Sequence, residues 1–304
     1  MLQGLADEQS WLPSKLFYDD EGSRLFEAIC DVDEYYPTRT ELGILEACRS
    51  DVAEAVGGQL TLVEYGSGST KKVRLLLDGL DIAAYVPIDI SRWYLEEAAE
   101  KLAGSHPGLV VRPVLADFNQ DIRLPDDLPP GPRMAFFPGG TIGNLRPHDA
   151  VDFLSRTGKT LGTGGYLLIG YDLRKEPQRL HAAYNDRAGV TADFNRNVLR
   201  RLNSELDADF DLDHWLHYAP YVPARGRIEM HLVSDRNQEV HVGDETFHFY
   251  RGDSIRTELS HKYTRPGFDS LAEAAGFEVM RHWMDDEQLF CVSLLRVSAL
   301  SVIR

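Results

Sequence analysis

The sequence predicts an α/β fold with a mostly parallel sheet, and two features of the chain lead to this prediction. Between about residue 60 and residue 170, short apolar segments alternate with longer segments whose apolar side chains recur at helical spacing. Strands that alternate with helices form a parallel sheet through right-handed crossovers. The alternation stops after Asp172 and resumes near Asp269, so we expect an insertion at roughly 174–258. A chain of 304 residues is long enough for one large domain with such an insertion.

Five segments are expected to form the parallel strands. These strands are expected at 60–65, 83–89, 109–115, 134–137 and 165–170, with helices between them at 73–77, 92–102 and 147–161. Two further helices precede them, one at 22–30 and one from Pro37 through Val52, since Pro fits the first turn of a helix. Ligands bind at the carboxyl ends of parallel strands, which indicates the loops at 66–68, 89, 117–118 and 139–144 as candidate sites.

The remaining segments complete the expected organisation. The insertion carries a polar helical segment at 177–197, which 199–210 continues, and strand-like segments at 227–232, 239–242 and 246–250. A helix at 269–275 and closing strands at 277–280 and 289–295 then return to the sheet. We therefore predict a core formed by 40–173 and 259–304. The N-terminal helices and the insertion, 1–39 and 174–258, are expected to form a second domain.

The net charge of the chain argues against several classes of partner. Lys and Arg total 32 against 48 Asp and Glu, which gives −16 at pH 7. A phosphate backbone or an anionic membrane surface requires a basic protein surface, so we expect neither nucleic acid nor membrane as a partner. No apolar run approaches the roughly 20 residues that cross a bilayer. Residues 1–11 lack the pattern of a signal peptide. We expect a cytoplasmic monomer.

The spacing of Cys and His indicates neither a disulfide framework nor a metal site. Cys30, Cys48 and Cys291 are odd in number and contain no CxxC pair, which is typical of free thiols in a reducing compartment. The ten His residues form no HxH, HxxxH or HExxH set. We therefore expect no bound metal.

A glycine turn follows the first expected strand. Gly66-Ser67-Gly68-Ser69 comes directly after Val63-Glu64-Tyr65, and glycines let a backbone approach a ligand closely. Lys71 stands where a dinucleotide-binding GxGxxG motif has its third glycine, which disfavours a pyrophosphate here. A glycine turn with an acid before it suits a ligand with a cationic centre and no phosphate, such as S-adenosylmethionine (SAM). Taken alone, the segment is also compatible with an ordinary strand-to-helix turn.

Acidic residues end the next two strands. Asp89 lies 21 residues after Gly68, where a carboxylate can accept both hydroxyls of a ribose. Asp117 can accept from the amino group of an adenine, and Phe118 can stack on the ring. Each feature alone is weak, because surface acids and acid–aromatic pairs are common. Their order along the chain predicts a Rossmann-like, class I SAM-dependent methyltransferase core.

Longer motifs recur together in one known family. They are Tyr35-Tyr36-Pro37-Thr38-Arg39-Thr40-Glu41, Gly66-Ser67-Gly68-Ser69, Pro138-Gly139-Gly140-Thr141-Ile142-Gly143-Asn144 and Ala188-Gly189-Val190-Thr191-Ala192-Asp193-Phe194-Asn195-Arg196-Asn197. On these motifs the chain, from about Lys15 to about Leu295, resembles the L-histidine-specific Nα-methyltransferases of ergothioneine biosynthesis (EgtD). It departs from the family pattern at Tyr65, Ser69 and Gly140, where the family has Leu, Thr and Ser. The tail 297–304 lies outside the resemblance.

The resemblance implies two sets of site residues and makes the second domain a substrate-binding domain. The set implied for SAM is Tyr18, Gly66, Gly68, Lys72, Asp89, Asp117 and Phe118. The set implied for the substrate is Tyr35, Gly139, Thr141, Asn144, Tyr184, Met230, Glu258 and Ser260. Asn144 and Tyr18 are implied to be catalytic.

The implied reaction is the Nα-trimethylation of L-histidine to hercynine, the first step of ergothioneine biosynthesis, with S-adenosylhomocysteine (SAH) as product. An α-amine must lose its proton before its lone pair attacks the sulfonium methyl, and the transfer then depends on orientation. Asn144 can hold the amine by its amide oxygen and donate to the carboxylate through its amide N–H groups. Tyr184 can also donate to that carboxylate. Tyr18 can offer its oxygen or ring face to the ammonium.

The implied imidazole site explains a preference for histidine. Glu258 can accept from one ring N–H, while Ser260 and Tyr35 pair with the other nitrogen, and Met230 shapes the pocket. A site built to pair both nitrogens rejects amino acids that lack them, because its polar groups would stay unpaired.

Other functions remain open from the sequence. A methyltransferase for another amino acid, such as a tryptophan derivative, would need an apolar cradle where Glu258 and Met230 stand. A SAM-binding regulatory protein without activity would not need Asn144, Tyr184 and Glu258. Nucleic-acid methylation is disfavoured by the net charge and by the absence of an Asn/Asp-Pro-Pro-Tyr-type loop.

Overall fold

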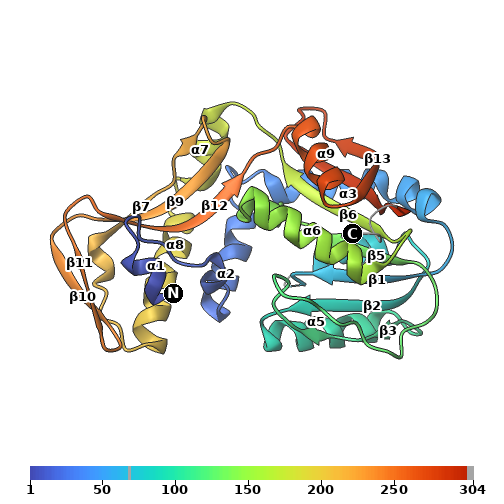
Figure 1. Cartoon of the computed structure of the whole chain (residues 1–304), viewed down its shortest axis with the longest axis horizontal. Coiled ribbons are helices and arrows are strands. Elements are labelled where there is room, and N and C mark those ends of the chain that lie inside the picture. Colours follow the sequence, from blue (N-terminus) through green and yellow to red (C-terminus); the bar gives the residue numbers. More distant parts are fainter. Residues whose placement is uncertain (68–69, 300–304) are drawn as a thin grey trace. The chain divides into compact units, whose positions relative to one another are not determined.

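The computed structural model describes residues 1–67 and 70–299, apart from the side chains of four residues at 93, 94, 97 and 98 (Figure 1). The chain divides into two compact units. Unit 1 contains Met1–Tyr36 and Lys175–Lys262, and unit 2 contains Pro37–Arg174 and Tyr263–Arg304. The sequence placed these boundaries at 39, 174 and 258.

The described residues of unit 2 form an eight-stranded sheet. The strand order is β13-β14-β6-β5-β1-β2-β3, and β4 also pairs with β2. Every pairing from β6 to β4 is parallel, while β14 runs antiparallel to both β6 and β13. The bounds are β1 Leu60–Tyr65, β2 Ile82–Asp89, β3 Val110–Val111, β4 Val114–Leu115, β5 Arg133–Phe137, β6 Tyr166–Asp172, β13 Phe277–Met284 and β14 Phe290–Val297. The order reverses between β1 and β5, and such switch points mark the ligand crevice of parallel sheets.

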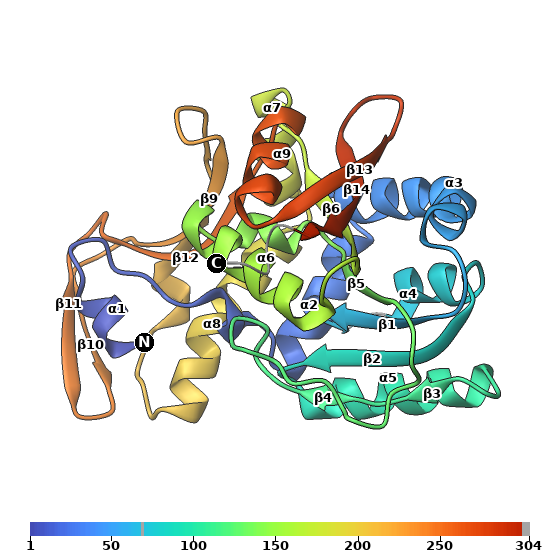
Figure 2. The ribbon, with the colours of Figure 1, turned by 45° about the vertical axis from the view of Figure 1, so that its right-hand side comes forward.

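Helices cover both faces of this sheet, so unit 2 has three layers. The helices are α3 Pro37–Val56, α4 Thr70–Leu77, α5 Arg92–Ser105, α6 Pro147–Leu161 and α9 Arg265–Ala274. One apolar cluster joins the sheet to α6 and α9, and a second joins the opposite face to α3 and α4. Figure 2 shows α5 lying along β2 and β3. The α/β fold predicted from the alternating segments is confirmed.

The predicted strand at 109–115 was wrong in one respect. It is two short strands, β3 and β4, because Pro113 between them has no N–H to donate to a ladder. The N–H of Arg112 still bonds the carbonyl of Tyr85 on β2, at 2.9 Å. The short 3-10 helix η2 Thr141–Asn144, which follows β5, was not predicted.

Unit 1 combines helices with two antiparallel sheets. The four-stranded sheet has the order β12-β9-β7, with β8 also paired to β9, and β10 pairs with β11. The strands are β7 Trp215–Tyr218, β8 Tyr221–Val222, β9 Arg227–Ser234, β10 Gln238–Val242, β11 Glu245–Phe249 and β12 Ser254–His261. The helices are α1 Leu2–Ala6, η1 Ser14–Phe17, α2 Asp20–Cys30, α7 Pro177–Tyr184, α8 Val190–Glu205 and η3 Leu212–His214.

The continuous helix predicted for 177–197 was wrong, because α7 ends at Tyr184 and α8 begins at Val190. Gly189 between them has φ +77°, a left-handed conformation that glycine adopts without strain. The carboxylate of Asp186 accepts the N–H groups of Val190 at 2.9 Å and Thr191 at 2.8 Å. These bonds satisfy the first N–H groups of α8, so the chain starts a new helix here.

Candidate active site

The glycine turn after β1 has the backbone that a close ligand requires. Gly66 has φ +76°, and an added Cβ would meet no atom within 4 Å. Its N–H donates to the carbonyl of Ile88 at 2.8 Å, which ties the turn to the end of β2. Glycine is needed here for its conformation, and the space beside it is open. Gly68, the other glycine predicted to bind SAM, lies outside the described residues.

Asp89 stands beside this turn at the end of β2. One carboxylate oxygen accepts the N–H of Ser91 at 2.9 Å. Burial raises the pKa of Asp89, and hydrogen bonds from the N–H groups of Ser91, Ile90 and Ser67 oppose the rise. The hydroxyl of Ser67 is buried and has no hydrogen-bond partner among the described residues. An unsatisfied hydroxyl beside a half-buried carboxylate fits a polar ligand such as the ribose of SAM.

Asp117 and Phe118 lie at the next strand end, as predicted. The N–H of Ala116 bonds the carbonyl of Asp89 at 3.0 Å, which brings this loop to the end of β2. One oxygen of Asp117 accepts from the backbone and side chain of Asn119, both at 2.9 Å. Phe118 packs edge-on against Phe137, with ring centroids 5.5 Å apart. Half-buried, Phe118 keeps part of its surface exposed, as an adenine-contacting ring requires.

Lys72 forms an ion pair that the sequence did not predict. Its ammonium lies 2.5 Å from a carboxylate oxygen of Glu41, a side chain that is only 1% exposed. The same carboxylate accepts the N–H of Gly139 through both oxygens, at 3.0 and 2.8 Å. Glu41 therefore joins a residue of the predicted SAM set to a residue of the predicted substrate set. In the sequence, only the position of Glu41 at the end of the motif 35–41 indicated that this residue belongs to the site.

The loop 138–144 is a tight turn that leads into η2. Gly139 and Gly140 have φ +83° and +68°, and a Cβ at Gly140 would lie 3.4 Å from the ring of Phe290. Both glycines are therefore suited to this turn, which explains how Gly140 can replace the family's Ser. Thr141 donates its hydroxyl to the carbonyl of Pro138 at 3.1 Å. Asn144, half-buried, forms no side-chain hydrogen bond within the described ranges, so its amide is available to a substrate.

Unit 1 brings together Tyr184, Ser260 and a lysine that the sequence analysis missed. The hydroxyls of Tyr184 and Ser260 lie 2.8 Å apart, and the ammonium of Lys262 donates to each oxygen at 2.9 Å. Lys262 is 3% exposed and also lies 4.6 Å from the centre of the Tyr184 ring. Lys262 thus holds the hydroxyl oxygens of Tyr184 and Ser260 next to each other.

Glu258 and Met230 face each other across two strands. They are register partners in the β12–β9 pair. Burial raises the pKa of Glu258 to about 7, and the charge of Lys262 opposes the rise. A carboxyl with a pKa near neutrality beside an apolar side chain can accept from an imidazole N–H or share a proton with it.

Tyr35 and Tyr18 belong to an aromatic cluster in unit 1. Tyr35 packs edge-on against Tyr184 at 6.2 Å and against Phe26 at 6.4 Å. Burial raises the pKa of Tyr35 well above its usual value, and the nearby Tyr184, Cys30, Glu258 and Tyr18 add to the rise. Tyr18 packs edge-on against Phe26 and Phe194, at 6.0 and 6.2 Å. Tyr35 therefore stays a neutral hydroxyl that can donate.

The predicted site residues are divided between the two units, and each unit holds members of both the SAM set and the substrate set. Unit 2 holds Gly66, Lys72, Asp89, Asp117, Phe118, Gly139, Thr141 and Asn144, and unit 1 holds Tyr18, Tyr35, Tyr184, Met230, Glu258 and Ser260. Within unit 2 the SAM set meets the substrate loop through Glu41. Within unit 1, Tyr184 joins the tyrosine cluster to Ser260.

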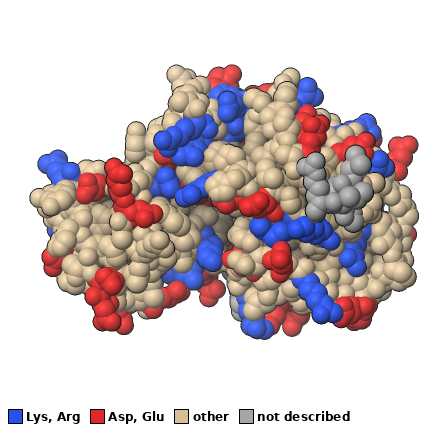
Figure 3. All heavy atoms as spheres, viewed as in Figure 1, with Lys and Arg blue, Asp and Glu red and all other residues tan. Residues whose placement is uncertain are grey.

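On the face shown in Figure 3, acidic and basic side chains are interspersed. Among the described residues no group of three or more His, Cys, Asp or Glu side chains is placed to hold a metal ion. The described part of the chain contains no helix long and apolar enough to span a membrane. None of the three cysteines, all of them among the described residues, forms a disulfide.

Two sequence relatives of this chain are histidine N-alpha-methyltransferases. A histidine N-alpha-methyltransferase of Mycobacterium tuberculosis is 41% identical over 96% of this chain and 92% of its own length. The corresponding protein of Mycolicibacterium smegmatis is 40% identical over the same shares. An L-tryptophan methyltransferase of Psilocybe serbica is 27% identical, over 94% of this chain and 88% of its own.

A solved structure shares the fold of this chain, and a family model shows its family. The solved structure of the PH0226 protein from Pyrococcus horikoshii has a TM-score of 0.51 at 13% identity, covering 92% of this chain and all of that one, which shows a shared fold. The sequence profile of the family described as histidine-specific, SAM-dependent methyltransferases matches residues 1–297. The chain therefore belongs to the histidine-specific, SAM-dependent methyltransferase family.

Proposed function

We propose that this enzyme trimethylates the α-amine of L-histidine to hercynine, with SAM as methyl donor, as the first step of ergothioneine biosynthesis. The observation that carries the proposal is the polar group of Glu258, Ser260 and Lys262, in which Glu258 lies opposite Met230. The carboxyl of Glu258 and the hydroxyl of Ser260 can pair with the two nitrogens of an imidazole ring. The 41% identity to a histidine N-alpha-methyltransferase supports the same substrate.

Unit 2 carries the residues that suit the cofactor. Asp89 would accept both ribose hydroxyls, with the unsatisfied hydroxyl of Ser67 beside it. Asp117 would accept from the adenine amino group, and Phe118 would contact the ring. Lys72 would pair with the carboxylate of the cofactor's amino-acid end. When bound, SAM supplies a methyl group on a sulfonium that an amine can displace.

Orientation of the amine is the main task of the remaining residues. The free amide of Asn144 would hold the α-amine through its oxygen and the carboxylate through its N–H groups. Tyr184 would donate to the carboxylate while its oxygen accepts from Lys262. Tyr18, which is half-buried, would contact the ammonium. Each amine loses its proton before transfer, and the held geometry favours in-line attack.

The experiment that tests the proposal identifies the end product. Purified enzyme is incubated with L-histidine and excess SAM, and products are followed by tandem mass spectrometry with positional assignment of the methyl groups. We expect mono- and dimethylated intermediates that disappear into hercynine, with three SAH formed per hercynine. A reaction that stalls at monomethylhistidine with fresh cofactor present contradicts the trimethylation. Methylation on the ring contradicts the Nα assignment.

A tryptophan derivative is the second candidate substrate, because an L-tryptophan methyltransferase is also a relative over nearly the whole chain. Its identity of 27% is lower, and an indole has one ring N–H and no ring acceptor, so it would pair with Glu258 opposite Met230 but not also accept from Ser260 as an imidazole can. Parallel incubation with L-tryptophan therefore gives little product if histidine is the substrate.

A further inference from the structure

A register shift in β12 decides which way Glu258 faces. Ile255 is fully buried and pairs with Leu232 on β9, and Arg256 pairs with His231. Side chains alternate along a strand, so Glu258 would share the face of Arg256 if the strand were regular. That face carries the charged residues of β9.

The pairing slips by one residue between Arg256 and Glu258. Glu258 then pairs with Met230, and Ser260 pairs with Ile228, both buried residues of β9. A β-bulge inserts one extra residue and redirects the side chains that follow it. Thr257 is that residue, and it returns Glu258 and Ser260 to the buried face.

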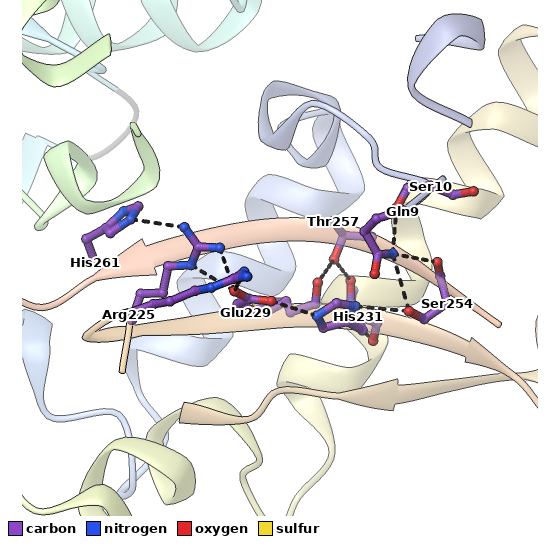
Figure 4. Close-up of polar contacts among 11 residues, drawn as sticks. Gln9, Ser10, Arg225, Glu229, His231, Ser254, Thr257 and His261 are labelled. Carbon is purple, nitrogen blue, oxygen red and sulfur yellow. Dashed lines mark hydrogen bonds and ion pairs between the residues drawn. The ribbon is translucent and has the colours of Figure 1, made fainter. Parts of the chain in front are cut away.

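Thr257 is fixed by its own hydroxyl. The side chain is 1% exposed, and its Oγ1 donates to Oδ1 of Asn195 at 2.6 Å, with the carbonyl of Met230 at 3.2 Å. A second acceptor on the opposite strand holds the bulge residue against β9. The dashed contacts of Thr257 are visible in Figure 4.

Asn195, from α8, connects both strands. Its Nδ2 donates to the carbonyl of His231 on β9 at 3.0 Å, while its Oδ1 accepts from Thr257 on β12. Asn195 is fully buried, and its Nδ2 also lies 2.9 Å from Nδ1 of His217. A single amide thus satisfies polar groups on both sides of the bulge.

Charged residues fix the opposite face of the same strands. Glu229 accepts from Arg227 at 2.6 Å and from Arg225 at 3.1 Å, and it lies 3.4 Å from His231 (Figure 4). Arg227 also reaches His261 on β12 at 3.4 Å. These residues already have partners, so a Glu258 turned to this face would meet Glu229 rather than a substrate.

We propose that Thr257 and Asn195 are positioning residues for substrate recognition, because they hold the bulge that turns Glu258 and Ser260 toward the buried face. The inference rests on the proposed function, since it takes histidine as the molecule that those two side chains recognise. Neither Thr257 nor Asn195 contacts the imidazole in this account. They act by setting the direction of Glu258 and Ser260.

The test uses the full-length enzyme with Thr257→Val, which keeps the shape and removes the hydroxyl, and Thr257→Ser, which restores it. We expect Thr257→Val to lower kcat/KM for histidine by about 10-fold to 100-fold, the effect of losing a buried hydrogen bond together with the geometry it holds. Thr257→Ser recovers most of that loss. Affinity for SAH stays within about twofold, because all of its proposed residues except Tyr18 lie in unit 2. Thr246→Val, an exposed threonine on β11, is the matched control.

Two measurements distinguish a positioning role of Thr257 from a general loss of stability. In a Glu258→Gln background, Thr257→Val should cause a smaller further loss with histidine, since part of its effect acts through Glu258. Thr257→Val should also lower the ratio of histidine to tryptophan turnover. If the valine variant does not fold, Thr257→Ala leaves the same hydroxyl missing without the added methyl group.

The outcomes are distinct. Full histidine activity in a folded Thr257→Val or Thr257→Ala protein contradicts the inference, as does an equal loss in the presence and absence of Glu258. A wild-type enzyme that binds SAH but methylates no histidine contradicts the proposed function itself.

Discussion

At the scale of single residues, Glu258 links recognition to stability. Its pKa in the folded chain is about 7, against 4.5 for an ordinary Glu, because burial disfavours the charged form. A carboxyl with a raised folded pKa contributes stability that is present below pH 4.5 and is lost as the pH rises through 7. Without substrate, the free energy of unfolding should therefore fall between pH 5 and pH 8 by at most about 3 kcal/mol from this residue.

The measurement is chemical unfolding of wild type and Glu258→Gln across that range. The Gln variant should lose this part of the pH slope, whatever its absolute stability. Identical slopes for the two proteins would show that Glu258 is already ionised in the folded chain.

Lys262 gives a second prediction at this scale. It donates to Tyr184 and Ser260, so Lys262→Met leaves two hydroxyls without their cationic donor. We expect kcat/KM for histidine to fall by about 10-fold to 100-fold, since bonds to charged groups are worth about 1.5–3 kcal/mol. SAH affinity measured by calorimetry should not change. A matching loss of SAH affinity would mean that Lys262 acts on the fold as a whole.

At the scale of elements, Glu41 on α3 depends on a glycine in β6. A Cβ on Gly170 would lie 2.0 Å from a carboxylate oxygen of Glu41 and 2.9 Å from the Phe290 ring. Gly170→Ala should therefore displace Glu41 from Lys72 and Gly139, and weaken SAH binding by about tenfold with a lower Tm.

A second glycine provides the control for this change. Gly43 lies on the same helix as Glu41, with no atom within 4 Å of an added Cβ. Gly43→Ala should leave SAH affinity unchanged and raise stability by about 0.5–1 kcal/mol. If Gly170→Ala binds SAH as tightly as wild type, Glu41 does not position Lys72.

Some elements could be predicted from the sequence, whereas a helix break and a bulge could not. Apolar periodicity predicted the parallel strands, because buried strands require it over their whole length, as β1 illustrates. The same periodicity predicted one continuous helix across α7 and α8, because the break between them depends only on Gly189 and Asp186. It could not predict the bulge at Thr257, since strict alternation places Glu258 on the wrong face.

The same limit applies to the site. Gly66, Asp89 and Asp117 follow strand ends, where position in the chain implies position in the sheet, so pattern alone indicated them. Glu41 and Lys262 gave no such signal. Their importance depends on burial and on partners far along the chain, 98 residues away for Glu41 and Gly139 and 78 for Lys262 and Tyr184.

At the scale of the whole molecule, the family match covers both units, from residue 1 to residue 297. The core of unit 2 has the strand order of a SAM-binding sheet, while the residues proposed to recognise imidazole all come from unit 1. Selectivity for histidine and use of SAM are therefore expected to respond to different substitutions.

A competition assay tests the central claim most directly. The enzyme is given SAM and an equimolar mixture of the common L-amino acids, and every methylated product is quantified by mass spectrometry. Selective recognition by Glu258 and Ser260 predicts that hercynine and its partly methylated precursors account for nearly all product. Methylated tryptophan or another amino acid as the main product, with histidine unconsumed, would contradict the assignment of histidine as the substrate.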